Sequence, residues 1–350
     1  MRPAGTFDES YSQDMAIVRT RFQWIMLIAG LIFLFGVLPQ ISSYYVLTLA
    51  NLIGITVIGA LGLQILLGYC GQISMGHMAF MGVGAYVTGI MMSHLGLPWF
   101  AALICAAAAS ALLGLVFGLP ALRIKGFYLA LSTMAAHFII IWAIWHGGDI
   151  TGGVYGLSIP RPHIGEFVIK GEKSFFYLIM IFMVIMTFIA KNLVRMKLGR
   201  ALIAIRDNDI AAEFMGINVF YYKLVAFTIA SAFAGVSGAL YALYLGNIAP
   251  EQFAFLDSLW YIGYLIIGGL GSITGVFFGV TFLLALRQVV MIAAPTISVV
   301  MPGLSEGILA ATMQITFGSV IALFLIFEPR GLYHRWEVAK STIRLWPFPY

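Results

Sequence analysis

Charge is what this sequence has least of. Asp, Glu, Lys and Arg make up only 9% of its 350 residues, whereas 61% of the residues are hydrophobic. Soluble domains carry roughly 25% charged residues. A soluble fold of this length cannot bury so much apolar surface, so the composition excludes one and predicts an all-α integral membrane protein with several spans.

Cysteine is nearly as scarce. Cys70 and Cys105 are the only two, and both lie in or beside apolar runs, so the sequence indicates neither a disulfide framework nor a metal site. The net charge of +5 at pH 7 comes without a basic patch with interleaved aromatic residues, which argues against a nucleic-acid partner. Membrane lipid is the expected surrounding instead, because cytoplasmic loops of membrane proteins carry such an excess of Lys and Arg.

Catalytic and nucleotide-binding motifs are also lacking. The sequence has no G-x-x-x-x-G-K-[ST] phosphate loop, no H-E-x-x-H, no G-x-S-x-G and no cluster of carboxylates. We therefore expect no ATPase site and no cofactor in this chain. A membrane-embedded enzyme is the least favoured of the possible classes, because it would need catalytic groups that the sequence does not offer.

What the sequence does contain is a series of long apolar runs. A helix needs about 20 apolar residues to cross a bilayer, and shorter pieces are tolerated when protein surrounds them. On this basis we predict about ten transmembrane helices, near residues 23–39, 44–67, 75–94, 98–119, 126–146, 174–194, 223–246, 257–268, 273–292 and 308–327. The stretch 257–292 can form either one span or two, because three glycines at 268, 269 and 271 make a natural turn in its middle.

The loop charges predict the orientation. With ten spans both termini lie on one side, and taking that side as the cytoplasm places 15 of the 19 Lys and Arg residues there. Nine spans would put the basic C-terminal tail outside, against the positive-inside rule. We therefore expect a cytoplasmic tail over 1–22 without a cleavable signal pattern, a membrane domain over 23–327 and a cytoplasmic tail over 328–350.

The cytoplasmic loop 195–223 is a polar interruption between two apolar runs. Asn208 can cap a short helix that Asp209 opens, and Gly216 can end it. An amphipathic helix of about two turns is marginal alone in water, so we expect it to lie against something. The alternative is a simple inter-helix loop that contains one isolated helical turn and has no docking role. The residues of the helix that carry the prediction are Asp209, Ile210, Ala211, Ala212, Glu213, Phe214 and Gly216.

Two stretches break apolar runs with glycine, Gly68–Tyr86 and Gly263–Val280. Irregular backbone at membrane depth is tolerated only inside protein or beside a water-filled path, and its occurrence in both halves hints at an internal repeat. Simple helix packing explains most of the other glycines. The candidate path residues are polar groups at membrane depth: Asn51, Gln72, Ser74 and His77. Asn51, Gln64 and Gln314 bridge helices or line a path, and the sequence does not choose between these roles. For His77 and His137, a packed and hydrogen-bonded position is the expected role, ahead of a ligand or a proton relay.

The outer loop 147–173 is rich in glycine and proline. Its segment Thr151–Pro162 suits a docking surface for a partner protein, and a plain connection fits equally well. The residues that we single out are Thr151, Gly152, Gly153 and Gly156.

An energy source is missing from the spans. We expect no Asp, Glu or Lys inside them, whereas proton-coupled carriers keep such groups near the midplane. Arg287 is expected near the outer end of its span, where it can snorkel. A path without its own energy source, together with a cytoplasmic helix suited to docking, indicates a primary transporter whose motor is a separate protein. A secondary carrier working alone is the alternative.

Several segments, in order, resemble the permeases of branched-chain amino acid ABC transporters of the LivM type. They are GYCGQISMGHMAFMGVGAY from Gly68, TGGVYGLSIP from Thr151, the run Gly199–Gly246, GYLIIGGLGSITG from Gly263 and FEPRGL from Phe327. The resemblance covers the chain from about Asn51 to Leu332. It implies a permease of the second importer class, with ten spans, two pseudo-repeated halves and a permease domain over 23–327 in the inner membrane.

The resemblance also implies partners. These are a second permease of the LivH type, two ATP-binding subunits of the LivG and LivF type that hold ATP and Mg, and a periplasmic substrate-binding protein. Ile210, Ala211, Ala212 and Gly216 match the coupling pattern Glu-Ala-Ala-x-x-x-Gly of ABC permeases, except that Ile210 replaces the Glu. Related systems import urea, amides or other amino acids, and the residues do not choose among these substrates.

Overall fold

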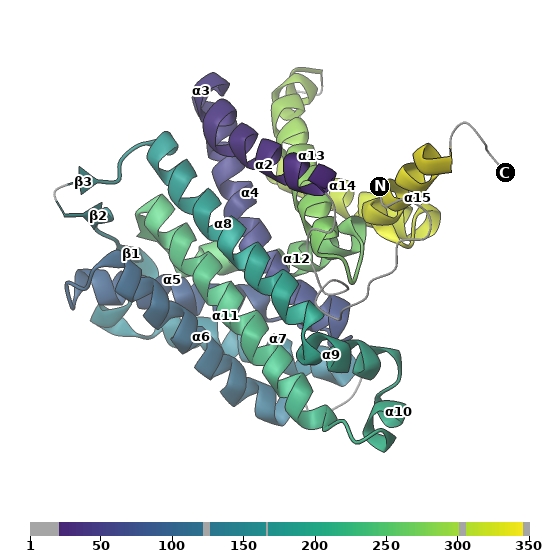
Figure 1. Cartoon of the computed structure of the whole chain (residues 1–350). Coiled ribbons are helices and arrows are strands. Elements are labelled where there is room, and N and C mark those ends of the chain that lie inside the picture. The colour runs from purple at the N-terminus through teal and green to yellow at the C-terminus, as the bar shows by residue number, and fades with distance from the viewer. Residues whose placement is uncertain (1–20, 122–126, 166, 301–305, 346–350) are drawn as a thin grey trace.

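The computed structural model describes residues 21–121, 127–165, 167–300 and 306–345. The chain is almost entirely helical (Figure 1). The first half contains α2 (Arg21–Ile32), η1 (Phe33–Val37), α3 (Leu38–Ile41), α4 (Tyr44–Leu63), η2 (Gln64–Tyr69), α5 (His77–Ser93), α6 (Trp99–Ala121) and α7 (Phe127–Trp145). The second contains α8 (Glu172–Arg195), α9 (Lys197–Asp207), α10 (Asp209–Phe214), α11 (Val219–Leu245), α12 (Phe255–Gly268), α13 (Ile273–Val300), α14 (Glu306–Phe327) and α15 (Gly331–Leu345).

A helix is present at each of the ten predicted apolar runs. Seven helices in the described residues are long and apolar enough to cross a membrane, or up to eight if α14 and α15, which meet at a bend of 43°, form one span. Helix α12 is apolar but shorter, with 14 residues. The protein is therefore a helical, multi-span membrane protein. The predicted N-terminal tail lies almost wholly outside the described residues.

Helix α11 is the centre of the bundle, and α4, α5 and α6 pack around it (Figure 1). The close approach of α11 to α5 depends on glycines, which have no side chain. A Cβ atom on Gly84 would lie 2.2 Å from the carbonyl oxygen of Gly235, and one on Gly238 would lie 1.8 Å from that of Met81. Small residues let helices approach this closely inside a membrane. At these positions the glycines serve helix packing, as the sequence indicated.

The stretch 257–292 forms two helices. Helices α12 and α13 pack against each other as a hairpin, and the turn between them contains Gly269 at φ +114° and Gly271 at φ +79°. Both are backbone conformations that only glycine adopts easily. The turn also meets the C-terminal segment, because a Cβ on Gly331 would lie 2.6 Å from Gly269. The predicted C-terminal tail thus begins with a helix, α15, that is packed on the membrane domain.

The small strands lie at the opposite end of the bundle from α10 (Figure 1). Strand β1 (Leu157–Ser158) pairs antiparallel with β4 (Asn247–Ile248), and β2 (His163–Ile164) pairs antiparallel with β3 (Phe167–Val168). The 3-10 turns η3 (Gly148–Ile150), η4 (Gly153–Tyr155) and η5 (Pro250–Phe253) belong to the same loops. Helix α11, at about 1.5 Å per residue, joins the two ends over roughly 40 Å.

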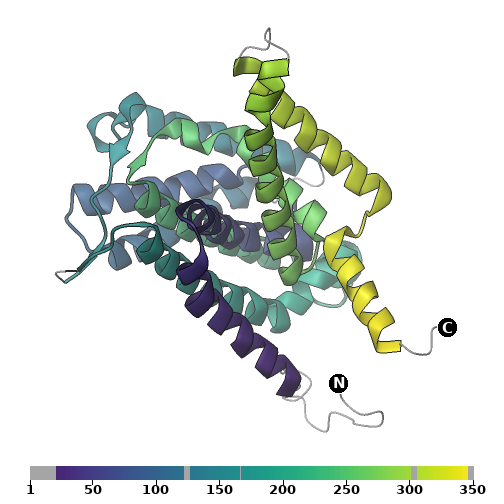
Figure 2. The same ribbon diagram turned by 90° about the horizontal axis from the view of Figure 1, so that it is seen from above.

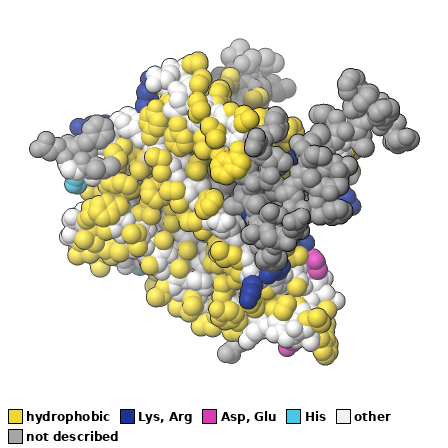
Figure 3. Space-filling view, in the orientation of Figure 1, with side chains coloured by type: hydrophobic (Ala, Val, Ile, Leu, Met, Phe, Trp, Pro, Cys, Tyr) yellow, Lys and Arg dark blue, Asp and Glu magenta, His cyan; other side chains and the backbone are white. Residues whose placement is uncertain are grey.

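Helix α2 stands apart from the bundle, as the view from above shows (Figure 2). Only 6% of its apolar run with η1 and α3 is buried inside the chain. Hydrophobic side chains also cover much of the described face in Figure 3. Exposed apolar surface of this extent is stable only against lipid or another subunit.

Candidate functional site

A cavity of about 450 Å³ lies among α4, α5, α11, α12 and α13. This volume is within the range of about 300–1,000 Å³ that ligand pockets have. Its lining differs from side to side. The residues from α4 and α5 are almost all apolar: Leu49, Leu52, Ile55, Met78 and Met81, with Thr56 as the exception. The lining from α11 to α13 contains most of the polar groups: Tyr241, Gln252, Asp257, Tyr261, Tyr264, Arg287 and Gln288.

Asp257 and Arg287 are the two charged residues of this lining. The Arg287 guanidinium acts electrostatically on the Asp257 carboxylate, yet no ion pair joins them in the part of the chain that the structure describes. The carboxylate also bonds the backbone of Ala254, which precedes α12. The cavity therefore presents one negative and one positive group that are not closed on each other.

One sequence expectation is corrected here. The expectation that the spans carry no acidic side chain was wrong, because Asp257 lies in the first turn of α12, within the predicted run 257–268, and lines the cavity. Arg287 lies toward the end of the apolar run Ile273–Ile292, as expected, and the helix α13 itself continues to Val300. Arg287 also lines the cavity, which the sequence did not indicate.

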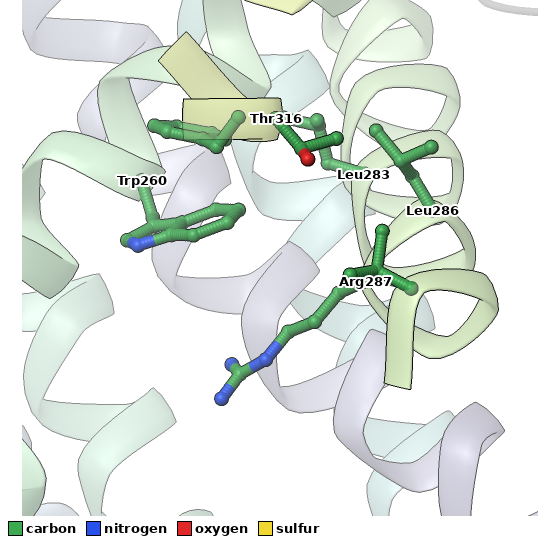
Figure 4. A pocket seen from close by; sticks show the side chains of 7 residues that line it. Trp260, Leu283, Leu286, Arg287 and Thr316 are labelled. Carbon is green, nitrogen blue, oxygen red and sulfur yellow. The ribbon is translucent and has the colours of Figure 1, made fainter. Parts of the chain in front are cut away.

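A smaller hollow of about 10 Å³ adjoins the same arginine between α12, α13 and α14 (Figure 4). Leu283, Leu286, Thr316 and Trp260 surround it. The Arg287 side chain extends from α13 with its guanidinium pointing away from Thr316 (Figure 4). Trp260 and Arg287 line this hollow and the 450 Å³ cavity alike, so the charge belongs to the larger space.

None of the four predicted path residues lines the 450 Å³ cavity. Asn51 is fully buried, and its amide donates to the Glu172 carboxylate at 2.9 Å. Ser74 is buried in the break between η2 and α5. His77 begins α5, and its ring lies 5.0 Å from that of Tyr261, which is itself in the lining. His77 therefore lies one layer behind the cavity wall.

Gln72, the fourth residue, lines a second cavity of about 370 Å³. This space lies between the break after η2 and the polar loop of α9 and α10, and it also contains Asp209 and Lys223, an ion pair at 3.5 Å. Cys70 is buried beside it. Burial raises the pKa of the Cys70 thiol, and the nearby Lys223 opposes that shift. The structure thus brings one predicted path residue together with the first residue of α10.

The two glycine-broken stretches meet in space, because a Cβ on Gly68 would lie 2.7 Å from the backbone nitrogen of Gly271. Just before the first stretch, the Gln64 amide donates to the carbonyl oxygens of Gly269 at 3.1 Å and Ser272 at 3.0 Å. Arg206 of α9 donates from Nη1 to the carbonyl oxygen of Gly68 at 2.8 Å, and a Cβ on Gly271 would lie 3.0 Å from the same nitrogen. Arg206 therefore lies where both breaks meet the loop that carries α10. Sequence reasoning missed this role, because it depends on residues far apart in the chain.

The short helix predicted after Asn208 is present as α10. The Asn208 carboxamide accepts from the backbone N–H groups of Ile210 and Ala211, and Gly216 has φ +83°. Its apolar side is not packed in the described chain, because Phe214 is 88% exposed. The other members of the exposed face are Ile210, Ala211 and Met215.

Ala212 lies on the other side of α10. Both alanines belong to the predicted coupling pattern, but Ala212 is only 4% exposed and packs into the protein's own core. Of the two alanines, only Ala211 is exposed.

The outer loop is ordered by its own bonds. The Thr151 hydroxyl donates to the carbonyl oxygen of Ile144 at 2.7 Å and accepts from the N–H of Gly153. Gly152 and Gly156 have positive φ, and a Cβ on Gly156 would lie 2.3 Å from the carbonyl oxygen of Ile248. The four predicted residues therefore shape the loop. Its tip consists of exposed apolar side chains that the sequence analysis did not single out: Ile150, Val154 and Tyr155.

Comparison with known proteins identifies the family of this chain. The chain matches the family model of branched-chain amino acid transport system permease components over residues 45–325. The permease protein LivM of the high-affinity branched-chain amino acid transport system is 30% identical in Salmonella typhimurium, over 84% of this chain and 71% of the relative. LivM of Escherichia coli gives the same values. LivH of Salmonella typhimurium is 22% identical, over 80% of this chain and 92% of the relative.

No solved structure matches the chain significantly. The family model extends from the beginning of α4 to the end of α14, so it includes both cavities, the loop of α10 and the outer loop. The chain belongs to the family of permease components of branched-chain amino acid transport systems.

Proposed function

We propose that this chain is a membrane-spanning permease subunit of an ABC importer for branched-chain amino acids. The observation that carries the proposal is the family match over residues 45–325, which contains every residue that lines the 450 Å³ cavity. The LivM relatives are named as branched-chain amino acid transport permeases. A lining that combines apolar residues of α4 and α5 with polar residues of α11 to α13 supports a substrate with an aliphatic side chain and a charged end.

The finer architecture is part of the proposal. Ten spans, two pseudo-repeated halves of a type II importer, an inner-membrane location and two cytoplasmic termini are supported by the ten helices at the predicted runs. They are also supported by the distribution of Lys and Arg among the loops. The occurrence of a glycine-broken stretch in each half, Gly68–Tyr86 and Gly263–Val280, supports equivalent elements in two halves.

The proposed partners are a second permease of the LivH type, two ATP-binding subunits of the LivG and LivF type and a periplasmic binding protein. Similarity to both LivM and LivH supports a pair of related permeases. ATP and Mg²⁺ would be held by the ATP-binding subunits. The exposed tip of the outer loop, at Val154 and Tyr155, is the proposed contact for the binding protein.

Helix α10 is the proposed coupling helix. Its face of Ile210, Phe214 and Met215 is exposed, and an apolar helix face is well suited to a groove on a partner. Motion of α10 would reach the membrane domain through Arg206, which bonds the break after η2. That break leads directly into α5, whose Met78 and Met81 line the cavity.

One observation favours a second candidate, an ion-coupled carrier that works alone. Asp257 lines the cavity, and an acidic group inside a membrane protein is a common proton or cation site. An importer for urea, amides or other amino acids is a third candidate, since the family description names the system and not this chain's own substrate.

Reconstitution in proteoliposomes tests the proposal. We expect leucine, isoleucine and valine to be taken up only when both ATP-binding subunits, the second permease and the binding protein are present with ATP. Liposomes that contain this chain alone, under a proton or sodium gradient, are the matched control. Uptake by the chain alone would favour the secondary carrier, and uptake of urea in preference to leucine by the full complex would overturn the substrate.

A further inference from the structure

The 450 Å³ cavity has a charge arrangement that its volume alone does not explain. A path for uncharged solutes needs no ionised groups. An ionisable residue inside a membrane protein costs free energy, so its presence there usually marks a function. Here a carboxylate and a guanidinium line the same space, and no ion pair joins them in the described residues. The cavity therefore presents two opposite charges that a bound ligand can contact.

The apolar part of the lining comes largely from different helices than the charged part. Leu49, Leu52 and Ile55 belong to α4, and Met78 and Met81 belong to α5. Methionine side chains are flexible and adapt to apolar groups of different shape. Asp257 lies on α12 and Arg287 on α13. A ligand in this cavity has an aliphatic wall on one side and two opposite charges on the other.

We propose that Asp257 and Arg287 bind the two charged ends of an amino acid zwitterion during translocation. The Asp257 carboxylate accepts from the ammonium group, and the Arg287 guanidinium donates to the carboxylate group. The side chain of the amino acid lies against the α4 and α5 wall. This inference rests on the proposed function, because it assigns the substrate-binding groups within the same permease.

Neighbouring groups fit the assignment. The bond between the Asp257 carboxylate and the backbone of Ala254 fixes the carboxylate at the start of α12, and a carboxylate retains further lone pairs for an ammonium group. The oxygen Oε1 of Gln252 is buried in the same lining without a partner in the described chain, and so it is a second acceptor. Tyr241 and Tyr264 add hydroxyl groups on the same side.

Ligand protection in the assembled transporter tests the assignment. A cysteine replaces Thr56 in the cavity wall, Cys70 and Cys105 are replaced by alanine, and the rate of maleimide labelling is measured without nucleotide. We expect leucine to slow labelling more than 4-methylpentanoate, which lacks the ammonium group, or 3-methylbutylamine, which lacks the carboxylate. Loss of a charged hydrogen bond weakens binding roughly tenfold or more.

Each charge-neutralising variant is expected to lose the preference for leucine over one of the two analogues, and the analogue differs between the variants. In Asp257→Asn, 4-methylpentanoate should protect as well as leucine does, whereas 3-methylbutylamine should remain poor. In Arg287→Gln, 3-methylbutylamine should protect as well as leucine does. Asparagine is isosteric with aspartate, and glutamine is a polar, unbranched and smaller replacement for arginine, so neither change introduces a bulkier side chain. Glu251→Gln and Arg335→Gln, exposed and outside the cavity lining, are the controls and should behave as the parent.

Uptake separates this inference from the proposed function. If the parent complex transports leucine with ATP and both variants transport it equally well with the same analogue preference, the zwitterion assignment is overturned while the permease function stands. If the parent complex does not transport leucine, the proposed function fails first. Restoration of uptake by the double reversal Asp257→Arg with Arg287→Asp, with the parent's analogue preference, would show a structural pair and would also overturn the assignment.

Discussion

Single residues show how this protein holds polar groups inside an apolar bundle. Glu172, the first residue of α8, accepts from Asn51 of α4 at 2.9 Å and from the Tyr244 hydroxyl of α11 at 2.7 Å. A partly buried carboxylate needs such donors, because its charge loses water on burial. The bonds join three helices at one point. Asn51 thus bridges helices, which is one of the two roles that the sequence left open for it.

Replacing Asn51 by alanine should destabilise the fold more than it affects transport. Loss of the donor leaves Glu172 short of a partner, and we expect a free-energy cost of about 1–3 kcal/mol, measured as a lower unfolding temperature of the detergent-purified chain. Thr187→Val on α8 is the control, since that hydroxyl bonds only its own helix. A large fall in leucine uptake at unchanged unfolding temperature would instead support Asn51 as a path residue.

Arg206 offers a second test at this scale. Its guanidinium bonds the carbonyl oxygen of Gly68 and lies beside Gly271, so it links α9 to both breaks. Arg206→Ala should lower ATP-driven leucine uptake roughly tenfold while ATP hydrolysis by the complex continues, because motion of α10 no longer reaches the cavity. The control is Lys197→Ala, an exposed change on the same helix. Equal loss of uptake and hydrolysis would argue for a docking defect.

At the scale of elements, neighbouring residues in the sequence set where α10 begins and ends, whereas its proposed function requires a partner subunit. Asn208 caps it and Gly216 ends it, so neighbours in the sequence set the bounds of the helix. Its inner side is anchored by Ala212, which is buried. A bulky change at Ala212 therefore tests folding, and a change at Phe214 tests docking.

Phe214→Asp should leave the chain folded and abolish its association with the ATP-binding subunits. The side chain is 88% exposed, so its loss costs the isolated chain little, whereas a charge on the apolar face prevents seating in a groove. Co-purification of the ATP-binding subunits measures the effect, with Glu213→Gln on the same helix as the control. Normal co-purification and uptake in Phe214→Asp would show that α10 is not the coupling helix.

At the scale of the whole molecule, function requires two ends that face opposite sides of the membrane. Helix α11 runs from the loop of α10 to β4, and α8 runs between the same two ends (Figure 1). A length of roughly 40 Å for α11 exceeds the hydrocarbon thickness of about 30 Å. The proposed coupling helix and the outer loop are therefore far enough apart to lie on opposite surfaces.

Cysteine labelling tests this orientation. In right-side-out vesicles, a membrane-impermeant maleimide should label Tyr155→Cys and leave Phe214→Cys unlabelled, and inverted vesicles should give the reverse. Background from Cys70 should be low, because burial raises the pKa of its thiol and keeps it protonated. Labelling of both positions from the same side would contradict the proposal that α8, the one long apolar helix described between them, crosses the membrane.

The sequence by itself determined the class, the apolar helices and α10. These features depend on composition, on runs of consecutive residues and on caps a few residues away, so no distant contact is needed to predict them. The family resemblance also lay within the sequence, in ordered motifs, and the match over residues 45–325 agrees with it.

Only the tertiary structure decided where the polar groups point. Asp257 and Arg287 belong to different helices and face one cavity because α12 and α13 pack as a hairpin beside α4 and α5. For the same reason Asn51 meets Glu172 and not the cavity. The direction of a side chain on a helix that is apolar on nearly every side follows from the helix's neighbours, and those neighbours are set by packing between segments far apart in the chain.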